Sequence, residues 1–129
     1  MSNIVNNYAA AIAAGDFENI AATLSPEIKL LPPGANQPNE GKGKNSMMLS
    51  AVAAAVDGFK FVRSYQGSDN WHAILLEGSI EGTPVQFIDQ VHVDENDLVD
   101  HVDIFLRPAG MAATLLGKVT EEIKKRTSA

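Results

Sequence analysis

The first half of the chain repeats hydrophobic residues at the spacing of an α-helix. Ile4, Tyr8 and Ile12 lie four residues apart and form one apolar stripe, which predicts a helix between an N-cap at Asn3 and a stop at Gly15. The same reasoning predicts three further elements: a second helix over 16–24 capped by Asp16, a short strand over 27–31 ended by Pro32, and a third helix over 45–56 capped by Asn45 or Ser46.

From residue 59 onward the hydrophobic pattern changes to the period of two that is typical of β-strands. Turn sequences divide this part into four strands that should pair antiparallel, over 59–67, 70–82, 83–97 and 97–108. A last helix is predicted over 109–129, with Met111, Leu115, Val119 and Ile123 on one stripe. Helices followed by an antiparallel meander indicate an α+β fold, and 129 residues fit a single domain spanning 1–129.

Composition excludes several classes of protein. A formal net charge of −6 argues against a nucleic-acid partner, which requires a basic surface. The absence of cysteine excludes a disulfide framework, a cysteine nucleophile and cysteine-bound zinc. No apolar run is long enough for a membrane span and the first residues lack the pattern of a signal peptide, so we expect a cytoplasmic protein without a membrane partner.

Three short stretches, in their order along the chain, resemble one known superfamily. "YAAAIAAGD" resembles its first-helix signature, "ATLSPEIKLLPPG" its passage from the second helix to the first strand, and "FLRP" the end of its last strand. The sequence is therefore similar to the nuclear transport factor 2-like superfamily, which includes ketosteroid isomerases and SnoaL-like polyketide cyclases. The resemblance implies a cone-shaped curved sheet wrapped around the N-terminal helices, an apolar hollow that binds a small molecule, and a homodimer formed through the outer sheet face.

The resemblance also implies roles for two residues. Tyr8 and Asp89 fall where ketosteroid isomerases keep two hydrogen-bond donors for an oxyanion, the second being a carboxylic acid held neutral by an apolar site. Two alternatives stay open. Tyr8 is equally well explained as a core tyrosine, and Asp89 as a solvent-facing carboxylate or a partner of Arg63 or Arg107.

The base of the isomerases has no counterpart here, because Leu31 or Pro32 occupies its position. His101 and Asp103 are the candidate replacements, since a histidine titrates near neutrality and some SnoaL-like cyclases carry an acidic residue on an inner strand. In the isomerase-like pattern His101, Asp103 and Phe105 point into the cone. A buried hydrogen-bonded pair and an exposed face are the alternatives, and a slip of one residue would turn all three outward.

The remaining expected pocket residues come from the neighbouring strands. Alternation places His72, Ile74 and Leu76 on the inner wall, with Val91 beside Asp89, while Trp71 lies outside and could anchor a dimer. His72 is also consistent with a strand edge near solvent.

The functional prediction is a proton-transferring enzyme, isomerase-like or cyclase-like, that acts on a small apolar carbonyl compound. It needs no cofactor. A two-histidine, one-carboxylate metal site made by His72, His101 and Asp103 is a weaker interpretation, and we expect no metal. Two alternatives are a carrier that binds an apolar ligand without turnover, and an adaptor domain whose cone is filled by its own C-terminal helix.

Overall fold

The structure is a computed structural model that describes residues 3–127. Helix α1 (Ile4–Ala14) follows Asn3, whose side chain makes no capping hydrogen bond, and ends at Gly15 with a left-handed φ of 71°. Helix α2 (Phe17–Thr23) starts after Asp16, whose carboxylate accepts a hydrogen bond from the backbone N–H of Asn19 at 3.2 Å. Both predicted helices are confirmed, and Gly15 is required between them because L-residues with a side chain disfavour this backbone conformation.

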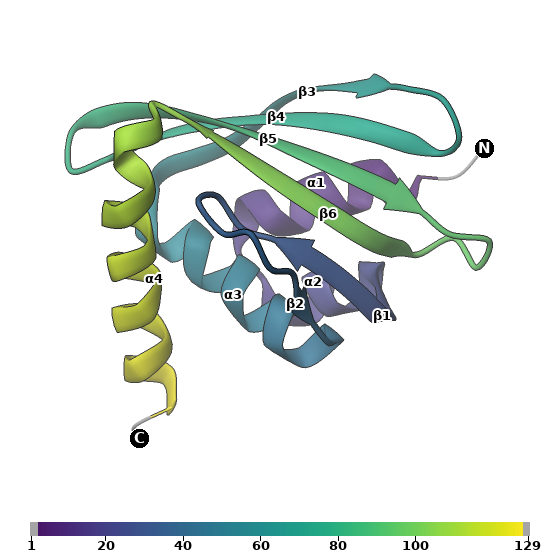
Figure 1. The fold of residues 1–129 in the computed structure, drawn as a ribbon, viewed down its shortest axis with the longest axis horizontal. Helices are drawn as coiled ribbons and strands as arrows, with labels where there is room; N and C mark the ends of the chain where they lie inside the picture. Colours follow the sequence, from purple (N-terminus) through teal and green to yellow (C-terminus); the bar gives the residue numbers. More distant parts are fainter. Residues whose placement is uncertain (1–2, 128–129) are drawn as a thin grey trace.

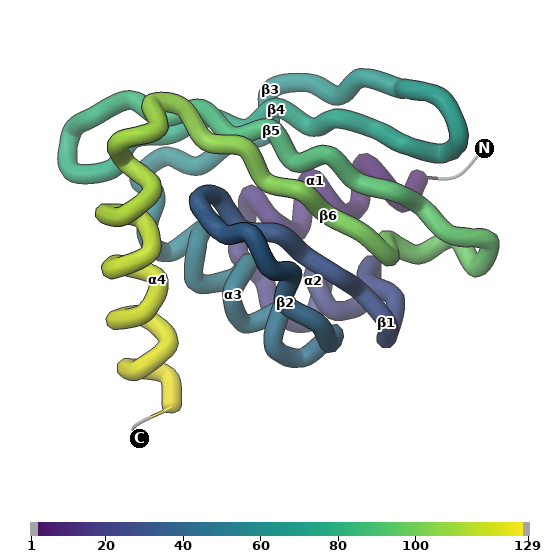
Figure 2. The backbone as a smooth tube through the Cα atoms, viewed as in Figure 1, coloured from purple at the N-terminus to yellow at the C-terminus, as the bar shows by residue number. Residues whose placement is uncertain are grey.

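One curved sheet contains the strands of residues 3–127 and covers the helices (Figures 1 and 2). In this described part of the chain, six strands lie in the order β2-β1-β6-β5-β4-β3. Their bounds are β1 Leu24–Leu31, β2 Asn39–Glu40, β3 Asp57–Gln66, β4 Trp71–Ile80, β5 Thr83–Val93 and β6 Val99–Arg107. The predicted α+β class and the antiparallel meander from β3 to β6 are confirmed. The short strand β2 was not predicted, and β1 pairs with β6 in parallel.

Helix α3 (Lys42–Ala55) begins earlier than the sequence pattern predicts. Asn45 and Ser46, the predicted caps, are fully buried inside the helix. The cause is local, because the side-chain amide of Asn45 donates to the backbone oxygens of Asn39 and Gly41, both at 3.0 Å. These bonds tie the first turn of α3 to β2 and to the helix N-cap.

The core lies between the concave face of the sheet and the helices. Tyr8 and Ile12 of α1 are buried there together with Phe87 of β5 and Val102 of β6. After a 3-10 turn (Ala109–Met111), helix α4 (Ala112–Thr127) runs beside α3 at one end of the molecule (Figure 1). Residues 128–129 of the predicted last helix lie outside the described residues. Within residues 3–127, no helix combines the length and apolar character that crossing a bilayer requires.

Candidate functional site

An apolar cavity of about 40 Å³ lies between the concave sheet face, α3 and α4. Its walls come from all layers of the fold: Ile12, Pro32, Pro33, Met48, Leu49, Val52, Phe59, Phe87, Asp89, Ile104, Ala112, Leu115, Leu116 and Val119. Asp89 is the one charged residue among them. A carboxyl group in such a wall needs a hydrogen-bond partner, because burying a polar group without one is costly.

Tyr8 supplies that partner. Its hydroxyl donates to Oδ2 of Asp89 at 3.2 Å, and both side chains are buried, Asp89 being 3% exposed. Burial raises the pKa of Asp89 from 3.8 to about 7, although the hydrogen bond from Tyr8 lowers it. Burial raises the pKa of Tyr8 as well, and the charge of Asp89 and the hydrogen bond to it raise it further. Tyr8 therefore stays protonated as the donor, and Asp89 changes charge near neutral pH.

The two residues do not reach the cavity equally. Asp89 borders it, whereas Tyr8 is not one of the wall residues and stands behind the carboxyl group. The alternative partners considered for Asp89 are engaged elsewhere: Arg63 donates to the hydroxyl of Tyr65, and Arg107 donates to the side-chain carbonyl of Gln86. The geometry thus presents one carboxyl group to the cavity, held from behind by a tyrosine.

The predicted inward placement of His101, Asp103 and Phe105 is wrong. Asp89 lies directly opposite Ile104 in the sheet, and residues directly opposite each other share a face. Ile104 therefore lines the cavity, and its neighbours in β6 point to the outer face, where Phe105 is 56% exposed. His101 and Asp103 do form a pair, with Nε2 and Oδ1 2.9 Å apart, but on the wrong side of the sheet to act on a molecule in this cavity.

Comparison with known proteins rests on structure. No protein-family model matches the sequence, and no curated protein matches it either. A steroid delta-isomerase from Pseudomonas aeruginosa superposes with a TM-score of 0.87 at 18% identity, over 98% of this chain and 93% of that chain. A protein of unknown function from Cytophaga hutchinsonii, described as NTF2-like, has a TM-score of 0.66 at 13% identity, over 84% of this chain and 91% of that chain.

A putative polyketide cyclase from Sinorhizobium meliloti gives a TM-score of 0.65 at 18% identity, over 81% of this chain and 94% of that chain. The protein has the nuclear transport factor 2-like fold. The fold expected from the sequence is therefore confirmed. At these identities the likeness concerns the fold alone, because unrelated functions share folds.

In this nuclear transport factor 2-like sheet, the remaining expected pocket residues lie on the concave face but outside the cavity. Ile74 pairs with Asp89, Leu76 with Phe87 and His72 with Val91. Ile74, Leu76 and Val91 are fully buried in the core, and His72 is half-buried at the start of β4. None of these four is among the wall residues, so a ligand would reach them only if the cavity widened along the sheet.

The outer face of the same sheet carries a separate polar cluster. The ring of Trp71 lies 5.0 Å from the ring of His92 and 5.4 Å from that of His101, and Nδ1 of His92 is 2.7 Å from Oδ1 of Asp100.

The three residues considered for a metal site lie on different faces of the sheet: His72 is on the concave face, and His101 and Asp103 are on the outer face. Within residues 3–127, no group of three or more histidine, aspartate or glutamate side chains is arranged to hold a metal ion.

Several wall residues of the nuclear transport factor 2-like cavity were interpreted from sequence only as helix stripes. Met48 and Val52 of α3, and Leu115 and Val119 of α4, recur at helical spacing and signal a buried face. Periodicity does not say that two such faces meet over a carboxyl group. That depends on how α3 and α4 dock.

Proposed function

We propose that the protein binds a compact, mostly apolar molecule that carries one hydrogen-bonding oxygen, and that Asp89 receives this oxygen. The observation that carries the proposal is a single carboxyl group facing an otherwise apolar cavity, with a buried tyrosine behind it. Small-molecule sites are commonly apolar hollows with a few placed polar groups. The shared fold with a steroid delta-isomerase and a putative polyketide cyclase supports a pocket protein.

The hydrogen-bonding capacity of Asp89 defines how it would hold the ligand. Tyr8 occupies Oδ2, which leaves Oδ1 for a molecule in the cavity. With a pKa of about 7, the carboxyl group is largely neutral below neutrality and then offers one O–H donor. A carbonyl or phenolate oxygen is the matching acceptor. Above neutrality the carboxylate only accepts, and hydroxyl groups become the better partners.

Proton transfer is the second candidate function, and the raised pKa of Asp89 favours it. A general base works best when its pKa lies near the operating pH. Because no other titratable side chain lines the cavity in residues 3–127, Asp89 would act alone. Its carboxylate would take a proton from the carbon beside a carbonyl, leaving an enolate, and the same carboxyl group would return that proton to another carbon. This scheme replaces the predicted role of His101 and Asp103 as bases.

The binding proposal is tested by fluorescence titration with 2-naphthol at pH 6. We expect saturable binding to the wild type and at least tenfold weaker binding to Asp89→Asn, which keeps the shape but loses the acidic donor. Tyr65→Phe, at an exposed tyrosine outside the cavity, serves as a control and should bind like the wild type. Equal affinity in wild type and Asp89→Asn would overturn the assignment of Asp89.

Turnover is tested separately from binding. Wild type and Asp89→Asn are incubated with an unsaturated cyclic ketone in D₂O, and deuterium entry beside the carbonyl is followed by NMR. Exchange catalysed by the wild type and lost in the variant supports proton transfer. Binding of the ketone without exchange identifies a carrier.

The expected homodimer remains a proposal for the outer sheet face. Phe105 and Tyr65 are exposed there, at 56% and 50%, and large apolar groups on one face are typical of interfaces. Sedimentation velocity of wild type and Phe105→Asp tests it. A dimer that becomes a monomer in the variant supports this face, and a monomeric wild type rejects it.

A further inference from the structure

Helix α4 supplies one side of the cavity. Leu115, Leu116 and Val119 are wall residues, and they face Met48, Leu49 and Val52 of α3 and the sheet residues around Asp89. Leu115 and Val119 are buried, whereas Leu116 is 65% exposed and stands at the margin. The C-terminal helix therefore contributes aliphatic side chains to the same cavity wall that contains Asp89.

The cavity left behind these side chains is too small for an organic ligand. Its volume is about 40 Å³. That is room for roughly two to four water molecules, whereas a cavity that admits benzene measures about 150 Å³. The apolar walls and Asp89 are suited to a ligand, and α4 supplies three of the side chains that line this small space. An organic ligand can enter only if some of the wall side chains move.

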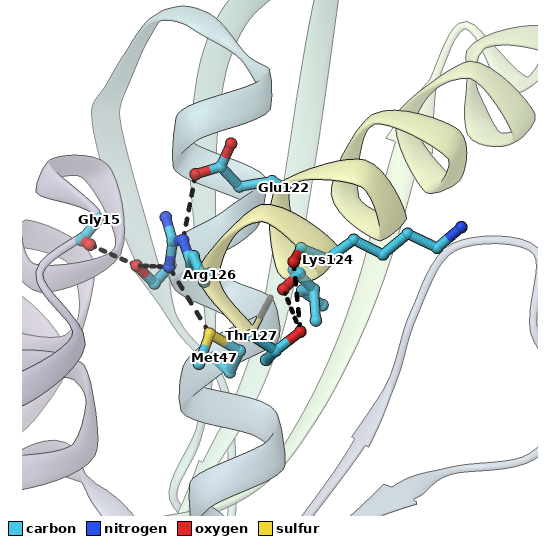
Figure 3. A network of polar contacts seen from close by, with 8 residues as sticks. Gly15, Met47, Glu122, Lys124, Arg126 and Thr127 are labelled. Carbon is cyan, nitrogen blue, oxygen red and sulfur yellow. Dashed lines mark hydrogen bonds and ion pairs between the residues drawn. The ribbon is translucent and has the colours of Figure 1, made fainter. Parts of the chain in front are cut away.

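Helix α4 is attached by one apolar stripe, by an ion pair in which Nζ of Lys118 lies 3.5 Å from Oε2 of Glu81, and by a polar latch near its C-terminus. Only Leu115 and Val119 are buried in this helix, and α4 packs mainly against α3. Near its C-terminus, Nη1 of Arg126 donates to Oγ of Ser50 at 2.8 Å, and Oγ of Ser50 donates to the backbone oxygen of Gly15 at 2.7 Å (Figure 3). Glu122 orients Arg126 from one turn away, with Oε1 3.1 Å from Nε.

Two glycines lie at and within α4. Gly110 precedes the helix and Gly117 lies in its middle, and a Cβ atom at either position would meet no other atom within 4 Å. Glycine in a helix interior lowers the stability of that helix. The helix therefore has a weak centre, a small buried stripe and a polar latch that joins its C-terminal end to α3 and α1, besides the ion pair of Lys118 with Glu81.

We propose that α4 is a displaceable lid whose Leu115, Leu116 and Val119 occupy the place of the ligand. The ligand and the lid compete for the same apolar walls over Asp89. This inference rests on the proposed binding function and adds the class of ligand. A molecule that replaces two leucine side chains and one valine side chain is a one- or two-ring, largely hydrocarbon compound with its oxygen directed at Asp89.

The lid is tested first without any ligand, by amide hydrogen exchange. Arg126→Gln breaks the latch. Lys125→Gln is the matched control, since it removes the same charge from the preceding residue, for which residues 3–127 show no hydrogen bond or ion pair. Loss of this part-buried hydrogen bond should speed exchange in residues 112–127 about fivefold, with residues 42–55 unchanged. Equal exchange in Arg126→Gln and the control overturns the latch.

The competition is then tested with 2-naphthol by stopped-flow fluorescence. When only the open state binds, the apparent Kd is the intrinsic Kd divided by the open fraction, so Arg126→Gln should bind about fivefold more tightly than wild type and Lys125→Gln. Leu116→Ala tests the same idea without touching the latch. It should bind more tightly if Leu116 occupies the place of the ligand, and more weakly if the ligand sits beside an intact α4.

The outcomes separate the lid from the binding function. Faster α4 exchange in Arg126→Gln with an unchanged 2-naphthol affinity shows entry by another route and overturns the lid. If exchange in α4 is faster but neither wild type, Arg126→Gln nor Leu116→Ala binds 2-naphthol, the proposed binding function is overturned. The proposed competition between α4 and the ligand is then overturned as well. Tighter binding by both variants supports the lid and the ligand class together.

Discussion

The hydroxyl of Tyr8 donates a hydrogen bond to the carboxyl group of Asp89 at 3.2 Å, although 81 residues separate them in the chain. The pair joins the first helix to the middle of β5 inside an apolar core. It gives Asp89 one satisfied oxygen and leaves the other for the cavity. The pair therefore combines a structural tie with the single polar group of the candidate site.

The stability of the protein should depend on pH through Asp89. The pKa of Asp89 is about 7 in the folded state against 3.8 ordinarily, so between these values the folded state binds a proton that the unfolded state has released. The free energy of unfolding therefore falls as pH rises through this range and levels off above it. Relative to Asp89→Asn, wild type should lose on the order of 3 kcal/mol between pH 5 and pH 8. Denaturant unfolding of both proteins at the two pH values measures this, and parallel curves would contradict it.

Removing the tyrosine hydroxyl should raise the pKa of Asp89 further. The hydrogen bond from Tyr8 favours the charged carboxylate, so Tyr8→Phe removes the one interaction that lowers this pKa. The variant should also lose about 1–3 kcal/mol of stability at pH 8, where the carboxylate is left without its donor. A ¹³C NMR titration of the Asp89 carboxyl group checks the direction. Tyr65→Phe, at an exposed tyrosine, should leave the titration in place.

Substitutions at His101 and Asp103 should not affect ligand binding. Both side chains lie on the outer face, across the sheet from the cavity. We expect His101→Gln and Asp103→Asn to bind 2-naphthol within twofold of wild type. The fluorescence emission of Trp71 should change in His101→Gln, because the rings of Trp71 and His101 are 5.4 Å apart. This change shows that the substitution alters its immediate surroundings. Loss of 2-naphthol binding in either variant would place these residues in the site after all.

Two glycine substitutions should have opposite effects. Gly117→Ala adds a methyl group to the middle of α4 where no atom lies within 4 Å, so it should stabilise that helix by about 1 kcal/mol. At Gly78 of β4 a Cβ atom would lie 2.9 Å from the backbone oxygen of Asp57 and also against Val56, so Gly78→Ala should destabilise the protein by at least 2 kcal/mol. Thermal unfolding of both variants measures the signs, and stabilisation by Gly78→Ala would contradict the packing described.

The alternation of side chains along β6 was predictable from the sequence, but the prediction of which set faces the concave side was wrong. The sequence separates Val102 and Ile104 from His101 and Asp103, because a strand sends neighbours to opposite faces. Which face is inside depends on the register with β5, where Asp89 stands opposite Ile104. Burial of the apolar set would have identified the correct face. The analogy with isomerases placed the polar set inward instead.

The position of Asp89 was easier to predict than the cavity in front of it. An acidic residue directly after Phe87 and Ile88 is unusual in a strand, because an ionised group is expensive to bury. The cavity depends on the way α3 and α4 close over the sheet, which is a tertiary arrangement without a local sequence signal. The start of α3 differs from the prediction for a local reason, since the side chain of Asn45 donates to the backbone of Asn39 and Gly41, which precede the helix in sequence.

The parallel pairing of β1 with β6 has a consequence for how the chain reaches its native state. Leu30 lies beside Val102, so the second of the two strands leaves the ribosome long after the first. Until then, β1 has only the two-residue strand β2 as a neighbour, and the hydrophobic side of α1 lacks its covering sheet. Contacts between distant parts of a chain slow folding. We therefore expect that the N-terminal helices do not pack stably during synthesis, and that the whole domain folds in one step once β6 has emerged.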